Sequence, residues 1–143
     1  LWLGQGPKRA VFHIESFETE ADITHALALA RTHGAIGVLA AGNDTPLEQF
    51  LALAPLADGV ECMGIAKIGA QGNPFDERVL ARIRAIRERH PGLSISVDGS
   101  VNMETILRLR DAGADRFVAG SAIFDAPDPA AAYRTLEELV RAP

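Results

Sequence analysis

The sequence contains little cysteine, few aromatic side chains and no long uninterrupted hydrophobic run. Cys62 is the single cysteine among 143 residues, so no internal disulfide can form, and we expect a reducing, cytoplasmic environment. No apolar run approaches the roughly 18 residues that span a bilayer. No signal peptide is recognisable either, so we expect no membrane association.

Positive charge is also scarce. Lys and Arg number 14 against 19 Asp and Glu, which gives a formal net charge of -5 at pH 7. Nucleic-acid binding requires clustered positive charge, so we expect no nucleic-acid partner. One helical segment is nevertheless rich in arginine, without interleaved aromatics, and we interpret it as an exposed, solvated basic face formed by Arg78, Arg82, Arg84, Arg87 and Arg89.

The hydrophobic fraction of 48% suffices for a folded core. Short β-rich runs alternate with amphipathic runs of helical period. We predict five strands, at Val11–Glu15, Ile36–Ala40, Val60–Ile65, Leu93–Asp98 and Arg116–Ala119. We predict five helices, at Asp22–Arg31, from an N-cap at Thr45 onward, and at Glu77–Arg89, Met103–Ala112 and Pro129–Arg141.

This strict alternation predicts an α/β fold with a parallel sheet and one domain over residues 1–143. Five βα units occupy the whole chain, whereas a complete (β/α)₈ barrel needs about 250 residues. The pattern is compatible with part of a barrel, with a chain that pairs with another, or with a small doubly wound sheet.

Two strand ends carry residues suited to binding a phosphate. In the fourth predicted strand, alternation places Asp98 on the face opposite Ile95 and Val97, at the carboxyl end where barrel enzymes hold their catalytic groups. Gly99 and Ser100 follow it with accessible backbone N–H groups. Gly120 and Ser121 end the fifth strand and open a short helical segment, a common phosphate-binding arrangement. A turn and a helix cap are the plain structural alternatives.

The predicted loop at 66–74 is longer than most βα connections and contains Gly69 and Gly72, which permit close approach of a ligand. Lys67 could add positive charge for an anion. His13 and Glu15 share one face of the first strand, so we expect a hydrogen-bonded pair in which His13 could also contact substrate. Cys62 is expected to be buried against the helices, with no chemical role.

These segments together resemble the ribulose-phosphate 3-epimerase family. Residues 97–102 (VDGSVN) and 112–124 (AGADRFVAGSAIF) are similar to a V-D-G-G strand end followed by G-A-D and V-A-G-S-A-I-F. Residues 12–15 (FHIE) resemble the family's H-x-E. Residues 63–75 resemble M-T-V-N-P-G-F-G-G-Q-x-F if one residue is inserted, and Met63 then matches a methionine that lines the site.

The resemblance implies a partial TIM (β/α)₈ barrel of the ribulose-phosphate-binding type. The five units would correspond to strands 4–8, and the N-terminal three units have no counterpart. It implies metal-dependent epimerisation of D-ribulose 5-phosphate and D-xylulose 5-phosphate at C3 through an enediolate. Asp98 would be both an acid/base and a ligand of a divalent cation (Zn, Fe, Mn or Co). Phosphate contacts would fall on Gly69, Gly72, Gly99, Ser100, Gly120 and Ser121.

The family's other catalytic aspartate and three further metal ligands lie on H-x-D and H-L-M segments of the first three strands. We therefore expect this chain alone to show little epimerase activity, and the complete protein to be a homo-oligomer. Ser100 also stands where the family has a second glycine. Two alternatives stay open: another phosphate-barrel enzyme, of the hexulose-phosphate synthase or decarboxylase type, and a non-catalytic sugar-phosphate-binding module.

Overall fold

The computed structural model describes residues 2–67, 69 and 73–141. Its centre is one sheet of five parallel strands in the order β1-β2-β3-β4-β5. The strands are β1 (Arg9–His13), β2 (Ile36–Ala41), β3 (Gly59–Met63), β4 (Ser94–Asp98) and β5 (Arg116–Val118). The predicted α/β class and parallel sheet are thereby confirmed.

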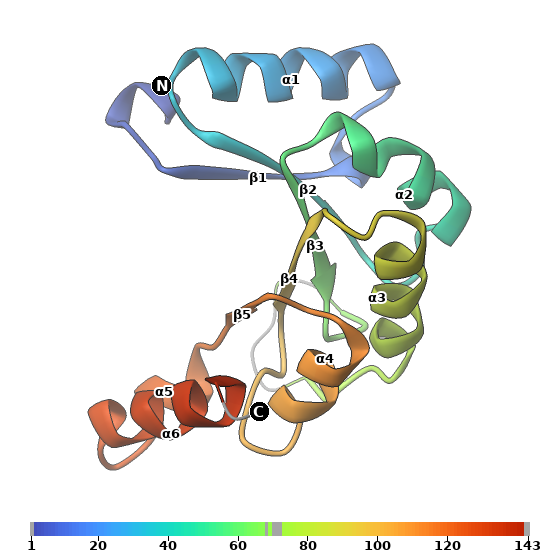
Figure 1. The fold of residues 1–143 in the computed structure, drawn as a ribbon. Coiled ribbons are helices and arrows are strands. Elements are labelled where there is room, and N and C mark those ends of the chain that lie inside the picture. Colours follow the sequence, from blue (N-terminus) through green and yellow to red (C-terminus); the bar gives the residue numbers. More distant parts are fainter. Residues whose placement is uncertain (1, 68, 70–72, 142–143) are drawn as a thin grey trace.

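Helices follow the strands in turn (Figure 1). They are α1 (Glu20–Thr32), α2 (Leu47–Leu53), α3 (Arg78–Arg89), α4 (Ile106–Ala112), α5 (Ser121–Phe124) and α6 (Pro129–Arg141), with short 3-10 turns at Leu3–Gln5, Ile14–Ser16 and Ala54–Leu56. Helix α1 begins at a capping box, in which the Thr19 hydroxyl accepts from the Asp22 amide and the Asp22 carboxylate accepts from the Thr19 amide. Gly113 ends α4 in the left-handed conformation that favours glycine.

The order of the strands separates a barrel from a doubly wound sheet. Spatial order equals sequence order, whereas a doubly wound sheet reverses direction at a switch point and carries helices on both faces. Figure 1 shows helices along the outer side of a curved sheet, with the opposite side open. The arrangement is five consecutive units of a parallel α/β barrel.

The helix-covered face of the sheet holds the core. Val60, Cys62, Ile95 and Val97 point toward the helices and are fully buried there. They pack against Phe50, Ile83, Ile86 and other apolar side chains of α2, α3 and α4. The Cys62 thiol therefore lies among apolar groups, and burial raises its pKa to about 12.

The other face, here called the concave face, carries fewer apolar side chains and is partly exposed to solvent. Strand register places Arg9, Glu61, Ser96 and Asp98 on it. Its apolar members include Val11, Ile36 and Val118, which stay 41%, 47% and 40% exposed. These residues correspond to the interior of a barrel.

Several predicted boundaries differ from the observed ones: β3 ends at Met63 and not at Ile65, and α4 begins at Ile106 and not at Met103. Strand β1 ends at His13 and not at Glu15, and Thr45 does not cap α2, whose N-cap is Pro46. The Thr45 hydroxyl instead donates to the Glu15 carboxylate, which also accepts from the Gly42 amide at 2.7 Å. The chain after His13 forms a 3-10 turn over Ile14–Ser16, which contains Glu15.

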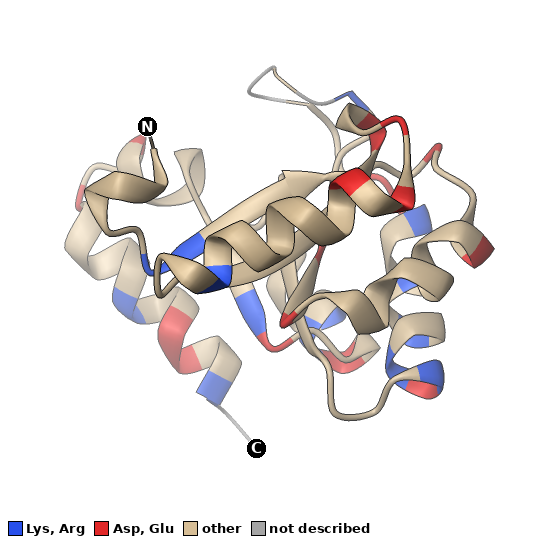
Figure 2. Ribbon diagram, turned by 90° about the horizontal axis from the view of Figure 1, so that it is seen from above, with Lys and Arg blue, Asp and Glu red and all other residues tan. Residues whose placement is uncertain are grey.

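The predicted exposed basic face on α3 is confirmed for Arg78, Arg84 and Arg89, which are exposed, but not for Arg82 and Arg87. Arg82 is buried at 6% exposure, with its guanidinium stacked over the Phe50 ring and donating to the carbonyl of Asn43. Arg87 donates to the carbonyl of Gly113 and pairs with Asp115. Figure 2 shows the Lys and Arg positions on several elements, with Asp and Glu positions among them. At the start of α3, Arg78 pairs with Asp44 and Asp76.

Candidate functional site

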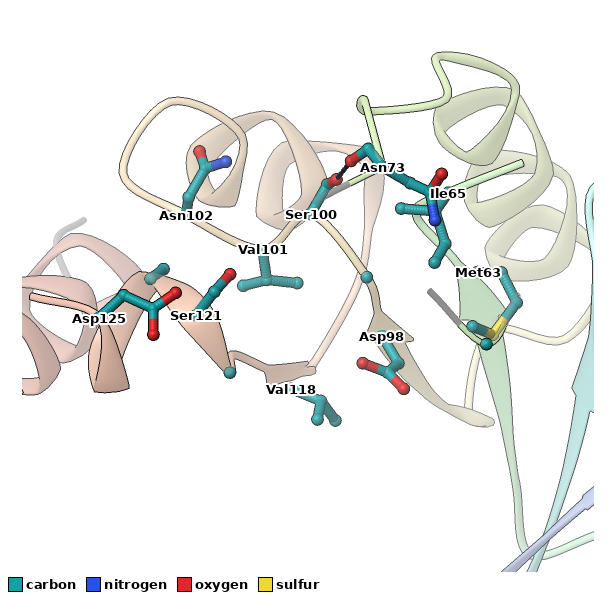
Figure 3. A pocket seen from close by; sticks show the side chains of 14 residues that line it. Met63, Ile65, Asn73, Asp98, Ser100, Val101, Asn102, Val118, Ser121 and Asp125 are labelled. Atoms are coloured by element: carbon teal, nitrogen blue, oxygen red, sulfur yellow. Dashed lines mark hydrogen bonds between the residues drawn. The ribbon is translucent and has the colours of Figure 1, made fainter. Parts of the chain in front are cut away.

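A pocket of about 650 Å³ opens at the carboxyl ends of β3, β4 and β5 (Figure 3). This volume falls within the range typical of small-molecule sites. Its walls come from three loops that are far apart in sequence but meet because parallel strands end on the same side. The lining residues are Met63, Ile65, Gly69, Asn73, Asp98, Gly99, Ser100, Val101, Asn102, Val118, Gly120, Ser121, Ala122 and Asp125.

Asp98 lines this pocket as the last residue of β4. It pairs in register with Met63 on β3 and Val118 on β5, so its side chain lies on the concave face, as the alternation predicts. Its carboxylate has no hydrogen bond or ion pair among the described residues. An unpaired carboxylate at this position is free to act on a bound molecule.

The next two residues form one wall of the pocket and have unusual backbone conformations. Gly99 has φ +95° and Ser100 has φ +50°, both in the left-handed region. The backbone just after β3 passes so close that a Cβ on Gly64 would lie 2.0 Å from the Gly99 carbonyl oxygen. The Ser100 hydroxyl donates to the carbonyl of Asn73 at 2.7 Å, which ties the loops after β3 and β4 together.

Gly120 and Ser121 form the facing wall, after β5. Ser121 begins α5, which confirms the predicted helical segment, but the helix is a single turn of four residues. A Cβ on Gly120 would meet no atom within 4 Å, so the backbone here borders open space. The two Gly-Ser corners therefore line one common pocket, as the sequence predicts.

The other predicted site residues divide into three groups. Met63 and Gly69 line the pocket, whereas Gly72 lies outside the described residues. His13 does not line this pocket; it ends β1, which β2 separates from β3, the nearest strand that contributes to the pocket. Lys67 is exposed and absent from the pocket wall, although its carbonyl accepts from the Asn73 side chain at 2.9 Å.

Sequence reasoning missed several polar residues around the site. Asn73, Asn102 and Asp125 line the pocket, and Asn102 lies in a stretch that already resembled the family. Glu61 was also missed, although it alternates with Val60 and Cys62 and so must lie on the same face as Met63. That alternation was the available signal.

Glu61 lies on the concave face in a polar cluster with Arg9 and Ser96. Arg9 crosses the curved sheet from β1 and donates to the Ser96 hydroxyl at 2.6 Å, while that hydroxyl donates to the Val60 carbonyl. Burial and the nearby Asp98 charge raise the pKa of Glu61, against the opposing effects of Ser96 and Arg9. Burial and the charge of Arg116 lower the pKa of Arg9.

The described residues provide an incomplete set of ligands for the expected divalent cation. Asp98 is one suitable oxygen ligand, but no group of three or more His, Cys, Asp or Glu side chains lies close enough within residues 2–67, 69 and 73–141 to hold a metal. Divalent metals need several such ligands. The described part of the chain does not by itself form a metal centre.

No helix in the described part of the chain combines the length and the hydrophobicity that crossing a membrane requires.

Sheet order, one-sided helices and a pocket at the strand ends define a class: a parallel α/β barrel, present here as five βα units. The model of the ribulose-phosphate 3-epimerase family matches residues 2–124. The chain belongs to the ribulose-phosphate 3-epimerase family.

Individual relatives agree with this assignment. The chain is 32% identical to ribulose-phosphate 3-epimerase of Mycobacterium leprae over 135 residues, which covers 92% of the chain and 58% of the relative. It is 29% identical to that of Eremothecium gossypii, covering 99% of the chain and 57% of the relative. The chain thus spans little more than half the length of these curated relatives.

Solved structures confirm the partial barrel. A 3-hexulose-6-phosphate synthase superposes with a TM-score of 0.74 at 28% identity, covering 93% of this chain and 62% of that one. KGPDC of Streptococcus mutans superposes with a TM-score of 0.76 at 16% identity, covering 97% of this chain and 64% of that one. The second likeness concerns the fold alone.

Proposed function

We propose that this chain binds the phosphate of a ketose 5-phosphate and supplies Asp98 as one acid/base of epimerisation at C3. The observation that carries the proposal is the shared pocket: an unpaired carboxylate and two Gly-Ser corners line one cavity. Family membership supports D-ribulose 5-phosphate and D-xylulose 5-phosphate as the substrates.

Binding begins at the phosphate in this proposal. The backbone N–H groups at Gly99–Ser100 and Gly120–Ser121 are suited to phosphate oxygens, because these residues line one cavity and glycine has no side chain to cover a neighbouring amide. The link from Ser100 to Asn73 fixes one wall before the ligand arrives. Holding the phosphate fixes the distance between the sugar carbons and Asp98, which lowers the entropic cost of proton transfer.

Proton transfer follows at Asp98. The carboxylate takes the proton from C3, and the electron pair left on C3 delocalises onto the C2 carbonyl oxygen to give an enediolate. Return of the proton from Asp98 to the same face restores the starting sugar. Inversion requires a second acid on the opposite face, and we place that group outside these 143 residues. A cytoplasmic location and a homo-oligomeric complete protein are further parts of the proposal; one rice relative is named a cytoplasmic isoform.

Deuterium exchange tests this scheme. D-Ribulose 5-phosphate incubated with the chain in D₂O is expected to exchange hydrogen at C3, detected by NMR, with little D-xylulose 5-phosphate formed. Asp98→Asn should abolish exchange while a phosphate-induced shift of the Gly120 amide persists. Rapid epimerisation would contradict the missing second acid, and binding without exchange would favour the non-catalytic module.

A second candidate is a reaction of the hexulose-phosphate synthase type. It is favoured by the 28% identity and TM-score of 0.74 with 3-hexulose-6-phosphate synthase. Product analysis after incubation with pentulose and hexulose phosphates separates the candidates. Conversion between pentulose phosphates alone supports epimerisation, whereas a change in carbon number supports the synthase type.

A further inference from the structure

The carboxylate of Glu15 has an arrangement that the proposed function does not use. Its Oε1 accepts two hydrogen bonds, from the Gly42 amide at 2.7 Å and from the Thr45 hydroxyl. Its Oε2 faces Nδ1 of His13 at 3.4 Å. One oxygen is therefore anchored to the loop after β2, and the other is directed at the imidazole.

The loop after β2 that donates to Glu15 is itself fixed by hydrogen bonds. The buried guanidinium of Arg82 donates to the carbonyls of Asn43 and Thr45, and so fixes the loop that supplies both donors to Glu15. Burial opposes ionisation of Glu15, but the bonds from Thr45 and the Gly42 amide outweigh it and lower the pKa of the carboxyl. Glu15 thus faces His13 as an ionised acceptor.

His13 lies on the concave face, at the end of the sheet where the pocket opens. It is the last residue of β1, at the same end of the sheet as Asp98, and its register with Ala40 and Glu61 puts it on the concave face. Its side chain is 32% exposed, and its Nε2 has no hydrogen-bond partner among the described residues. The charged groups that face it are Glu15 and, from β3, Glu61.

We propose that Glu15 is a positioning residue that keeps the imidazole proton of His13 on Nδ1, so that Nε2 accepts a hydrogen bond from a sugar hydroxyl. An imidazole nitrogen facing a carboxylate carries the proton, and the other nitrogen is then the acceptor. The inference rests on the proposed function for its ligand. The tautomer itself is a property of the free protein and is tested without any ligand.

The chain contains its own references for the two tautomers. In His33, Nδ1 lies 2.9 Å from the Leu29 carbonyl, which requires a proton on Nδ1. In His90, Nε2 lies 3.0 Å from the Leu51 carbonyl, which requires a proton on Nε2. Long-range ¹H–¹⁵N spectra at about pH 8.5, above the ordinary imidazole pKa, should show His13 with the pattern of His33.

Glu15→Gln sharpens the test because its amide oxygen can keep the bonds from Gly42 and Thr45. Its NH₂ group would then donate to Nδ1 of His13 and move the proton to Nε2. We expect His13 to change to the pattern of His90, while His33 and His90 stay unchanged and report an intact fold. Glu18→Gln removes an exposed charge nearby and should leave His13 unaltered. A wild-type His13 that already matches His90, or one unmoved by Glu15→Gln, would overturn the inference.

Ligand addition separates this inference from the proposed function. D-Ribulose 5-phosphate should shift Nε2 of His13 and the amides of Gly120 and Ser121, whereas inorganic phosphate should shift the amides alone. Shifted amides with an unmoved Nε2 would contradict the acceptor role of His13. Unmoved amides would contradict the phosphate site, and the tautomer result would stand by itself.

Discussion

The two faces of the sheet differ in burial and in the chemistry of their side chains. On the helix-covered face, Val60, Ile95 and Val97 are fully buried and apolar. On the concave face, the residues that alternate with them include Glu61, Ser96 and Asp98. Positions that stabilise the fold and positions suited to binding therefore alternate along the same strands, so each face can be altered without the other.

The thiol of Cys62 provides the largest expected contrast between the faces. Its pKa is raised to about 12 by burial, so alkylation by iodoacetamide should be on the order of 1,000-fold slower than for a free thiol. Val118→Cys places a second thiol on the partly open concave face and should react at the rate of a free thiol. Mass spectrometry after timed labelling measures both, and unfolding in guanidinium should equalise them. Rapid labelling of Cys62 in the folded chain would contradict the closed helix-covered face.

Truncation of side chains compares the same faces in stability. Ile83 is fully buried on α3, so Ile83→Ala should lower the free energy of unfolding by about 2–5 kcal/mol. Val118→Ala, at a 40% exposed position on the concave face, should cost under about 1 kcal/mol. Urea titrations followed by circular dichroism provide both values. Equal losses would mean that the concave face is packed as tightly as the core.

Strand alternation makes the difference between the two faces of the sheet predictable from the sequence. The position of Asp98 on the concave face follows from the apolar parity of Ile95 and Val97 alone. The meeting of the two Gly-Ser corners follows from parallel strands, whose carboxyl ends share one side. Both are local or topological consequences of the sequence pattern, which require no knowledge of long-range side-chain contacts.

Ser100 allows a smaller test within the pocket wall. Ser100→Gly should change stability by no more than about 1 kcal/mol, because relief of the left-handed backbone offsets the lost hydrogen bond to Asn73. Ser100→Ala loses the same bond and keeps the strained backbone, so it should be the less stable of the two. The reverse order in thermal unfolding would show that the backbone conformation at Ser100 carries no strain.

The smallest expected effect is the pH dependence of stability that Asp58 contributes. Burial opposes ionisation of Asp58, but hydrogen bonds from Arg31 and the Gly37 amide lower its pKa. A lowered pKa contributes stability above the unfolded pKa of about 3.9 and loses it as the pH falls through the folded value. Asp58→Asn should therefore be less stable near neutrality, with a gap that narrows toward about pH 3. A gap that stays constant in urea titrations across this range would contradict the lowered pKa.

The features that sequence could not predict are those set by contacts between distant segments. Thr45 has the sequence context of a helix N-cap, yet its hydroxyl donates a hydrogen bond to Glu15, 30 residues away. Arg82 belongs to an arginine-rich helix, yet it is buried because loop carbonyls and the Phe50 ring accept its guanidinium. These contacts join residues that are far apart in sequence, so only the folded structure shows them.

The central claim is that two Gly-Ser corners beside Asp98 bind one phosphoryl group. Titration of the ¹⁵N-labelled chain with D-ribulose 5-phosphate, and separately with D-ribulose, tests it most directly through the backbone amides. We expect the phosphorylated sugar to shift the Ser100, Gly120 and Ser121 amides together with one common dissociation constant, and D-ribulose to leave them nearly unmoved. Shifts confined to one corner, or equal shifts with both sugars, would contradict it.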